Sequence, residues 1–120
     1  MLKGLRGASI WSEDLTKTLL PFYRDTLGLA VGMEAPGFVL LGDPNGVSLA
    51  LGTHSDVHGK NADPARHMVA LDTDDCRGEV ARLRAAGVEI VEDVNDVGNG
   101  MLMATLRDPE GNLVQLMQFA

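Results

Sequence analysis

Apolar residues recur at helical spacing in two stretches of the chain, and each stretch ends at a glycine. The first begins near Ser12 or Asp14, contains Pro21 and stops at Gly28, and its apolar positions are Leu15, Leu19, Phe22, Tyr23 and Leu27. The second follows Asp74-Asp75 and stops at Gly87, and its apolar positions are Cys76, Val80, Leu83 and Ala86. This spacing puts apolar side chains on one helix face, and glycine favours a helix end. Two amphipathic helices are predicted, the first kinked or delayed by Pro21.

Shorter apolar runs surround each helical stretch and predict strands. In the first half they are Arg6–Trp11, Leu29–Met33, Phe38–Gly42 and Val47–Gly52. In the second half they are His67–Leu71, Val88–Glu92, Met101–Leu106 and Leu113–Phe119. Between the last two runs of each half lies a turn tetrad, Asp43-Pro44-Asn45-Gly46 or Asp108-Pro109-Glu110-Gly111. Proline second and glycine fourth favour a β-turn, so each tetrad predicts a hairpin.

The order strand–helix–strand–strand–strand thus occurs twice in 120 residues. In a chain of the usual size for one domain, this repeat predicts an α+β fold made of two βαβββ modules. We expect a single domain over residues 1–120, with the first module at 1–53 and the second at 67–120. The polar stretch 54–66 contains Gly59, Asn61 and Pro64, and it is predicted to be a linker.

Composition excludes several classes of partner. The formal net charge is -7 and the pI is about 4.7, so the clustered Lys and Arg that bind nucleic acid or a membrane surface are missing. No apolar run reaches the roughly 20 residues of a membrane helix. Cys76 is the only cysteine, which precludes an intramolecular disulfide and fits a reducing compartment. We expect a cytoplasmic protein with no nucleic-acid or membrane partner.

Two motifs resemble the vicinal oxygen chelate superfamily, which holds glyoxalases, extradiol dioxygenases, fosfomycin-resistance enzymes and bleomycin-resistance proteins. Asp14-Leu15 followed by Phe22-Tyr23-Arg24-Asp25-Thr26-Leu27-Gly28-Leu29 is similar to the first-helix signature of that superfamily. The stretch 106–116 is similar to its last hairpin, and 67–71 resembles the strand that opens its second module. The resemblance implies a cup-shaped mixed sheet around a central cavity, and a homodimer.

In the enzymes of this superfamily, four strand positions supply the ligands of one divalent metal. The resemblance carries these positions onto Gly7, Ala50, His67 and Gln115. His67 offers an imidazole and Gln115 a neutral amide, whereas the other two positions have no donor atom. Because a catalytic divalent site usually needs about three protein ligands, we expect no cofactor, with a divalent metal as the alternative.

Strand alternation extends these four positions to a predicted cavity face. Ser9 and Trp11 share the side of Gly7, Ser48 that of Ala50, Val69 and Leu71 that of His67, and Met117 that of Gln115. We therefore predict a ligand-binding set of Ser9, Trp11, Ser48, Ala50, His67, Gln115 and Met117. An apolar lining with a few polar groups is typical of a small-molecule site.

The sequence leaves more than one role open for Trp11 and for His67. Trp11 is either a stacking platform for a flat ligand or an ordinary packing residue. His67 is a relic ligand, a hydrogen-bonding group for a bound molecule, or a core histidine, and it is the one candidate catalytic residue. His54 and His58 are expected on the surface, and Cys76 is expected to be a buried structural cysteine.

Three functions follow from these features. The preferred hypothesis is a metal-independent binding protein resembling bleomycin-resistance proteins, which sequesters a hydrophobic or aromatic molecule such as an antibiotic. The alternative is a metal-dependent enzyme of the glyoxalase or dioxygenase type, a lyase or oxidoreductase, with a depleted shell of His67, Gln115 and water. The third is a metal-independent enzyme in which His67 acts as general acid or base.

Overall fold

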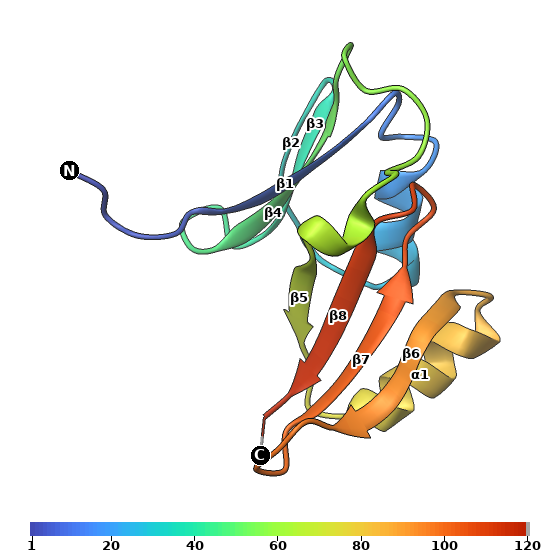
Figure 1. Cartoon of the computed structure of the whole chain (residues 1–120). Coiled ribbons are helices and arrows are strands. Elements are labelled where there is room, and N and C mark those ends of the chain that lie inside the picture. Colours follow the sequence, from blue (N-terminus) through green and yellow to red (C-terminus); the bar gives the residue numbers. More distant parts are fainter. Residues whose placement is uncertain (120) are drawn as a thin grey trace. The chain divides into compact units, whose positions relative to one another are not determined.

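The computed structural model describes residues 1–119, and the chain divides into two compact units between Gly59 and Lys60 (Figure 1). Unit 1 consists of β1 (Gly7–Ser12), η1 (Pro21–Thr26), β2 (Val31–Ala35), β3 (Phe38–Gly42) and β4 (Ser48–Thr53). Unit 2 consists of η2 (Pro64–Arg66), β5 (Val69–Asp72), α1 (Cys76–Ala85), β6 (Glu89–Asp96), β7 (Leu102–Arg107) and β8 (Leu113–Gln118).

The two sheets have the same topology. Each has four strands, in the order β1-β4-β3-β2 in unit 1 and β5-β8-β7-β6 in unit 2. The first strand of each unit runs parallel to the last, and the other pairs are antiparallel. The recurrence of one strand order confirms the predicted α+β fold and its repeat.

Most predicted strands lie within two residues of the observed ones, and β3 has the predicted bounds. The exception is β6, which was predicted to end at Glu92 and continues to Asp96. Its pairing with β7 is interrupted between Ile90 and Glu92 and again between Glu92 and Asn95. Bulges of this kind let a strand continue beside its partner although its side-chain alternation is broken, which is why the apolar pattern ends too early.

The first helical stretch is not a regular α-helix from Asp14. Residues 15–18 form turns, and η1 is a π-helix that begins at Pro21. The amides of Leu20 and Leu27 donate to the carbonyls five residues earlier, those of Leu15 and Phe22, at 2.8 Å each. Proline has no amide hydrogen and cannot close a turn from its own position. The prediction that Pro21 delays the start of the helix is confirmed. The helix that begins there has π geometry, with hydrogen bonds that span five residues.

Each unit buries apolar side chains of its helical segment and of its sheet. In unit 1 the buried side chains come from the helical stretch and from β3 and β4, and they are Leu15, Leu19, Phe22, Tyr23, Val39, Leu41, Leu49 and Leu51. In unit 2 they come from α1, β7 and β8, and they are Cys76, Val80, Leu83, Ala104, Leu106, Val114 and Leu116. Figure 1 shows α1 beside β6, and α1 also contacts β7 and β8. Of the predicted apolar stripes, Leu15, Leu19, Phe22 and Tyr23 in the first and Cys76, Val80 and Leu83 in the second are buried, whereas Leu27 is half-buried and Ala86, which follows α1, is exposed.

The segment from Lys60 to the start of β5 is tied to the β7–β8 turn inside unit 2. The Asn61 amide donates to the Glu110 carbonyl at 2.8 Å, and the Asn61 side-chain amide donates to Asn112 Oδ1 at 2.8 Å.

No helix among residues 1–119 is long and apolar enough to cross a membrane.

Asp75 caps α1. Its Oδ1 accepts a hydrogen bond from the Gly78 amide at 2.9 Å, and Gly87 follows the helix end with a φ of +88°. We expect Asp75→Ala to lower the free energy of unfolding by about 1 kcal/mol, because one amide of the first turn loses its acceptor. Urea unfolding followed by circular dichroism measures this. Asp74→Ala is the matched control, and an equal loss in both variants would contradict the capping role.

Candidate functional site

Four predicted ligand-binding residues lie on one face of the unit 1 sheet. In the parallel β1–β4 pair, Ser9 lies beside Ala50 and Trp11 beside Gly52. Strand partners in register place their side chains on the same face of a sheet, and β3 adds Phe38 and Leu40 to it. The opposite face carries the buried residues Val39, Leu41, Leu49 and Leu51. Ser9, Trp11, Ser48 and Ala50 are thus brought together on the other face, which we call the open face of unit 1.

Trp11 on β1 is paired with Gly52 on the neighbouring strand β4, and glycine has no side chain. A Cβ atom added to Gly52 would collide with Cζ3 and Cε3 of the indole. The ring therefore packs against the bare backbone of β4, and glycine is required there for this close approach. Trp11 nevertheless remains 40% exposed. The indole is held in place and still presents surface to a bound molecule.

His54 completes this aromatic group and is exposed, as predicted. Its ring centre lies 5.6 Å from that of Trp11, with the ring planes at 78°. The Asp56 amide donates to His54 Nδ1 at 3.0 Å, so the neutral imidazole carries its proton on Nε2. His54 follows the last residue of β4, Thr53, so alternation within the strand could not place it beside Trp11.

In unit 2, Gln115 and Met117 share a face with two residues that sequence analysis missed. Gln115 lies opposite Thr105, and Met117 opposite Met103, in the β7–β8 pair. Thr105 is buried, whereas Gln115 and Met117 are half-buried. The register set by the predicted turn at 108–111 could have placed Thr105 beside Gln115. This face, which we call the open face of unit 2, combines a hydroxyl and an amide with two methionines.

His67 is not on the strand where it was predicted. It follows η2, is exposed, and precedes β5, which begins at Val69. Val69 and Leu71 pair in register with Val114 and Leu116, which belong to the core under α1. The prediction that Val69 and Leu71 share the face of Gln115 is therefore wrong. The error came from extending strand alternation back through residues 67 and 68, where no strand exists.

The register of the two sheets also changes which residues of unit 1 correspond to which residues of unit 2. Ser9 lies beside Ala50 in unit 1, and Ala70 lies beside Gln115 in unit 2. Because Ala50 and Gln115 occupy equivalent places after the two turn tetrads, Ser9 is equivalent to Ala70. Gly7 is then equivalent to Met68 and not to His67.

The donor set does not fit a divalent metal centre. Among residues 1–119, no three His, Cys, Asp or Glu side chains gather closely enough to hold an ion. At Gly7, a Cβ would collide with the backbone carbonyl of Ser48, so that position is closed to any ligating side chain. Ala50 has no donor, and Gln115 supplies only a neutral amide.

Cys76 has the structural role predicted for it. It is fully buried at the start of α1, with its Sγ 4.0 Å from the Leu116 carbonyl oxygen. Burial is the main cause that raises the pKa of its thiol. A thiol with a raised pKa is a poor nucleophile at neutral pH, so the position offers no covalent chemistry.

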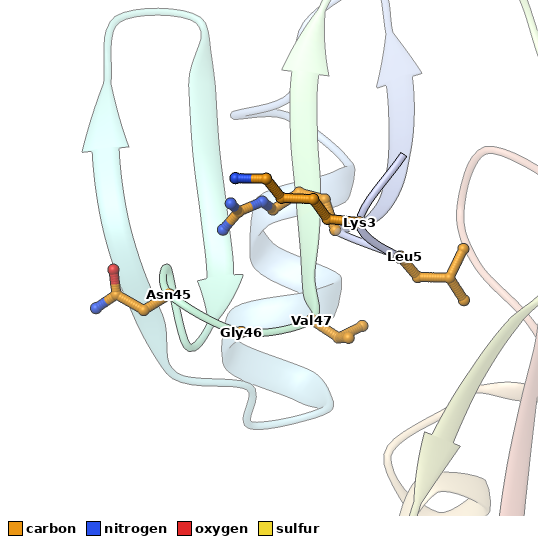
Figure 2. A pocket seen from close by; sticks show the side chains of 7 residues that line it. Lys3, Leu5, Asn45, Gly46 and Val47 are labelled. Carbon is orange, nitrogen blue, oxygen red and sulfur yellow. The ribbon is translucent and has the colours of Figure 1, made fainter. Parts of the chain in front are cut away.

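A cavity of about 250 Å³ lies where the N-terminal segment passes the turn at 43–46. Arg6 holds the two together, because its Nη1 donates to the Pro44 carbonyl at 3.3 Å and its carbonyl accepts from the Ser48 amide at 3.1 Å. In Figure 2, Lys3 extends to one side of this turn, and Leu5 and Val47 extend to the other. Leu5 is 88% and Val47 69% exposed. The cavity therefore lacks the enclosed apolar wall of a small-molecule site.

The comparisons with known proteins agree with this architecture. The Glyoxalase/Bleomycin resistance protein/Dioxygenase superfamily matches residues 8–116, and the chain belongs to this superfamily. A search of curated proteins gave no match.

Three solved structures illustrate the similarity of fold. TnmS3, an antibiotic binding protein from Streptomyces sp. CB03234, is 22% identical with a TM-score of 0.76, over 99% of this chain and 98% of its own. TioX from Micromonospora sp. ML1 is 17% identical with a TM-score of 0.74, over 98% and 100%. A glyoxalase/dioxygenase from Nostoc punctiforme is 15% identical with a TM-score of 0.76, over 98% and 92%. At these identities the likeness concerns the fold, which serves both binding proteins and enzymes.

Proposed function

We propose that this protein binds a hydrophobic or aromatic small molecule without a metal, in the manner of an antibiotic-sequestering protein. The observation that carries the proposal is the indole of Trp11, packed on the bare backbone of Gly52 and still 40% exposed. A fixed, partly exposed aromatic ring is suited to stack on a flat ligand, since aromatic pairs gain energy beyond the area they bury.

The neighbours of Trp11 favour the same kind of ligand. Leu40 and Phe38 are half-buried on its face, Ser9 adds an exposed hydroxyl group, and the Ser48 hydroxyl lies buried on the same face. Apolar surface with a few hydrogen-bonding groups suits a ligand that is mostly hydrophobic and carries several polar substituents.

Metal independence is part of the proposal and rests on the donor set. The position closed at Gly7, the missing donor at Ala50 and the neutral amide at Gln115 leave too few ligands for a catalytic divalent ion. TnmS3, which is itself an antibiotic binding protein, has the same fold, so this fold is compatible with the proposed binding. We also propose that the protein is a cytoplasmic homodimer, which its mass in solution and its fractionation in cells would test.

Tryptophan fluorescence tests this function directly, because Trp11 is the only tryptophan. We expect planar polycyclic aromatic compounds bearing hydroxyl or amide groups to change its emission in a saturable way, and saturated analogues to leave it unchanged. Metal analysis of protein purified without chelators should find no stoichiometric divalent ion. A bound stoichiometric metal, or no response across the whole panel, would overturn the proposal.

Removing the indole should weaken the same ligand about tenfold, or about 1.4 kcal/mol, as expected for the loss of one aromatic stack. Calorimetry with Trp11→Ala measures this without relying on fluorescence. Phe119→Ala is the matched control, because Phe119 is 64% exposed and lies beyond β8. Equal affinity in wild type and Trp11→Ala would show that the ligand binds elsewhere.

A further inference from the structure

A second cavity lies in unit 1 on the opposite side of the sheet from Trp11. It has a volume of about 350 Å³, and its lining comes from the turns before η1, from the end of β2 and the turn after it, and from β3. Leu15, Leu20 and Val39 form an apolar floor, and each is less than a tenth exposed. Val39 and Leu40 are adjacent on β3, so their side chains point to opposite faces. The cavity is therefore separate from the open face proposed for the aromatic ligand.

One residue fixes two walls of this cavity. The Thr53 amide donates to the Gly37 carbonyl at 3.0 Å and so holds the β2–β3 turn. The Thr53 hydroxyl oxygen accepts from the Leu15 amide at 3.1 Å and so holds the floor. These two hydrogen bonds, both made by Thr53 at the end of β4, hold the two walls in place without an occupant. Less conformational entropy is then lost when a molecule binds.

The polar groups of the lining select the charge of an occupant. Glu34 lies in register opposite Val39, so its carboxylate is on the face of the apolar floor. No ion pair within residues 1–119 involves Glu34. Arg24, whose charge Glu34 influences, is held by Asp25 through contacts of 2.8 and 3.1 Å. The Glu34 carboxylate is therefore exposed and outside any ion pair of the described residues, with Arg24 close enough to interact with it electrostatically.

Thr16 can only accept a hydrogen bond from an occupant. Its hydroxyl donates to Asp14 Oδ1 at 2.6 Å, and its amide donates to the same atom at 3.0 Å. These bonds also hold the pKa of Asp14 below its usual value, so Asp14 is ionised at neutral pH and keeps the hydroxyl hydrogen. Both polar side chains of the lining, Thr16 and Glu34, therefore require a donor.

We propose that this cavity is a binding site for a small apolar molecule that carries an ammonium group. The hydrocarbon part would lie against the exposed Ala35 and Pro36 above the buried floor, and the ammonium would donate to Glu34 and Thr16. An ammonium has three donors and no acceptor, which matches a lining of acceptors above an apolar floor. The site does not depend on the ligand proposed for the open face.

The probe for this site is 2-phenylethylamine, and its neutral isostere 2-phenylethanol is the matched ligand. In amide NMR spectra at neutral pH, we expect the amine to shift the signals of Thr16, Ala35 and Gly37 in a saturable way and to leave the Trp11 indole signal unchanged. The alcohol should bind about fivefold more weakly, the difference made by one exposed charge pair. Equal binding of amine and alcohol, or shifts centred on Trp11, would overturn the assignment.

Glu34→Gln should weaken the amine about fivefold and leave the alcohol unaffected. Glu92→Gln removes the same charge from an exposed residue of unit 2 and should change neither affinity. If Glu34→Gln binds the amine as tightly as wild type, the carboxylate is not part of the site and the proposal fails. Unchanged amide spectra of the free variant would show that it is folded.

Discussion

Replacing Gly7 by histidine, the metal ligand that the superfamily's enzymes place there, should lower the free energy of unfolding by about 3 kcal/mol and create no metal site. The reason is steric. A Cβ at this position would collide with the Ser48 backbone carbonyl, and a strand backbone paired in a sheet cannot move aside as a flexible side chain can. Chemical unfolding measures the loss, and calorimetry with zinc or nickel measures metal binding.

Two further variants isolate the cause of this loss. Gly7→Ala adds only the Cβ, so it should show most of the destabilisation. Gly4→Ala adds a Cβ at another glycine with a positive φ but with nothing within 4 Å, so it carries backbone strain without the collision and should lose clearly less stability than Gly7→Ala. A stable Gly7→His protein that binds a divalent ion would contradict both the closed position and the metal-independent function.

Leu106→Ala should destabilise the protein by about 3 kcal/mol, through lost apolar contact and the cavity left in the core of unit 2. Leu106 is fully buried on β7, on the face that α1 covers. Leu2→Ala makes the same chemical change at a side chain that is 98% exposed, and it should have almost no effect. Urea unfolding of both variants provides the comparison. Similar stabilities would mean that Leu106 does not belong to the core.

Local chemistry explains why much of the fold could be predicted. The tetrads at 43–46 and 108–111 carry proline and glycine where a β-turn needs them, so the hairpins they join are nearly correct. Gly87 ends α1 with a φ of +88°, which residues with a side chain rarely adopt. Apolar spacing identified the buried faces because burial requires a continuous apolar stripe.

The errors lie where a property of one segment depends on another. β6 continues past Glu92 because β7 remains beside it and bulges absorb the mismatch. His67 was placed on a strand because its neighbours are apolar, whereas β5 begins only where β8 provides hydrogen-bond partners, at Val69. Strand alternation is reliable only within a paired strand, since the partner fixes the register.

In the candidate site, too, the sequence predicted what depends on one strand and missed what depends on contacts between strands. The sequence predicted that Ser9, Trp11, Ser48 and Ala50 share a face, because alternation within β1 and β4 is local. It did not reveal His54 beside Trp11 or Thr105 beside Gln115, which depend on packing and register between strands. The cavity with Glu34 was also hidden, because an acidic residue in a strand looks like a solvent-facing one until its partner Val39 is known.

The sequence by itself determined the repeat, the hairpins, the helix ends and the lack of donors at Gly7 and Ala50. These features depend on backbone preferences and side-chain chemistry, which each residue carries with it. The tertiary structure decided that Gly7 cannot accept a side chain, that Gly52 supports an indole, and that Glu34 stands above an apolar floor. Those features depend on which atoms lie within a few ångströms across the sheet, and only folding brings them there.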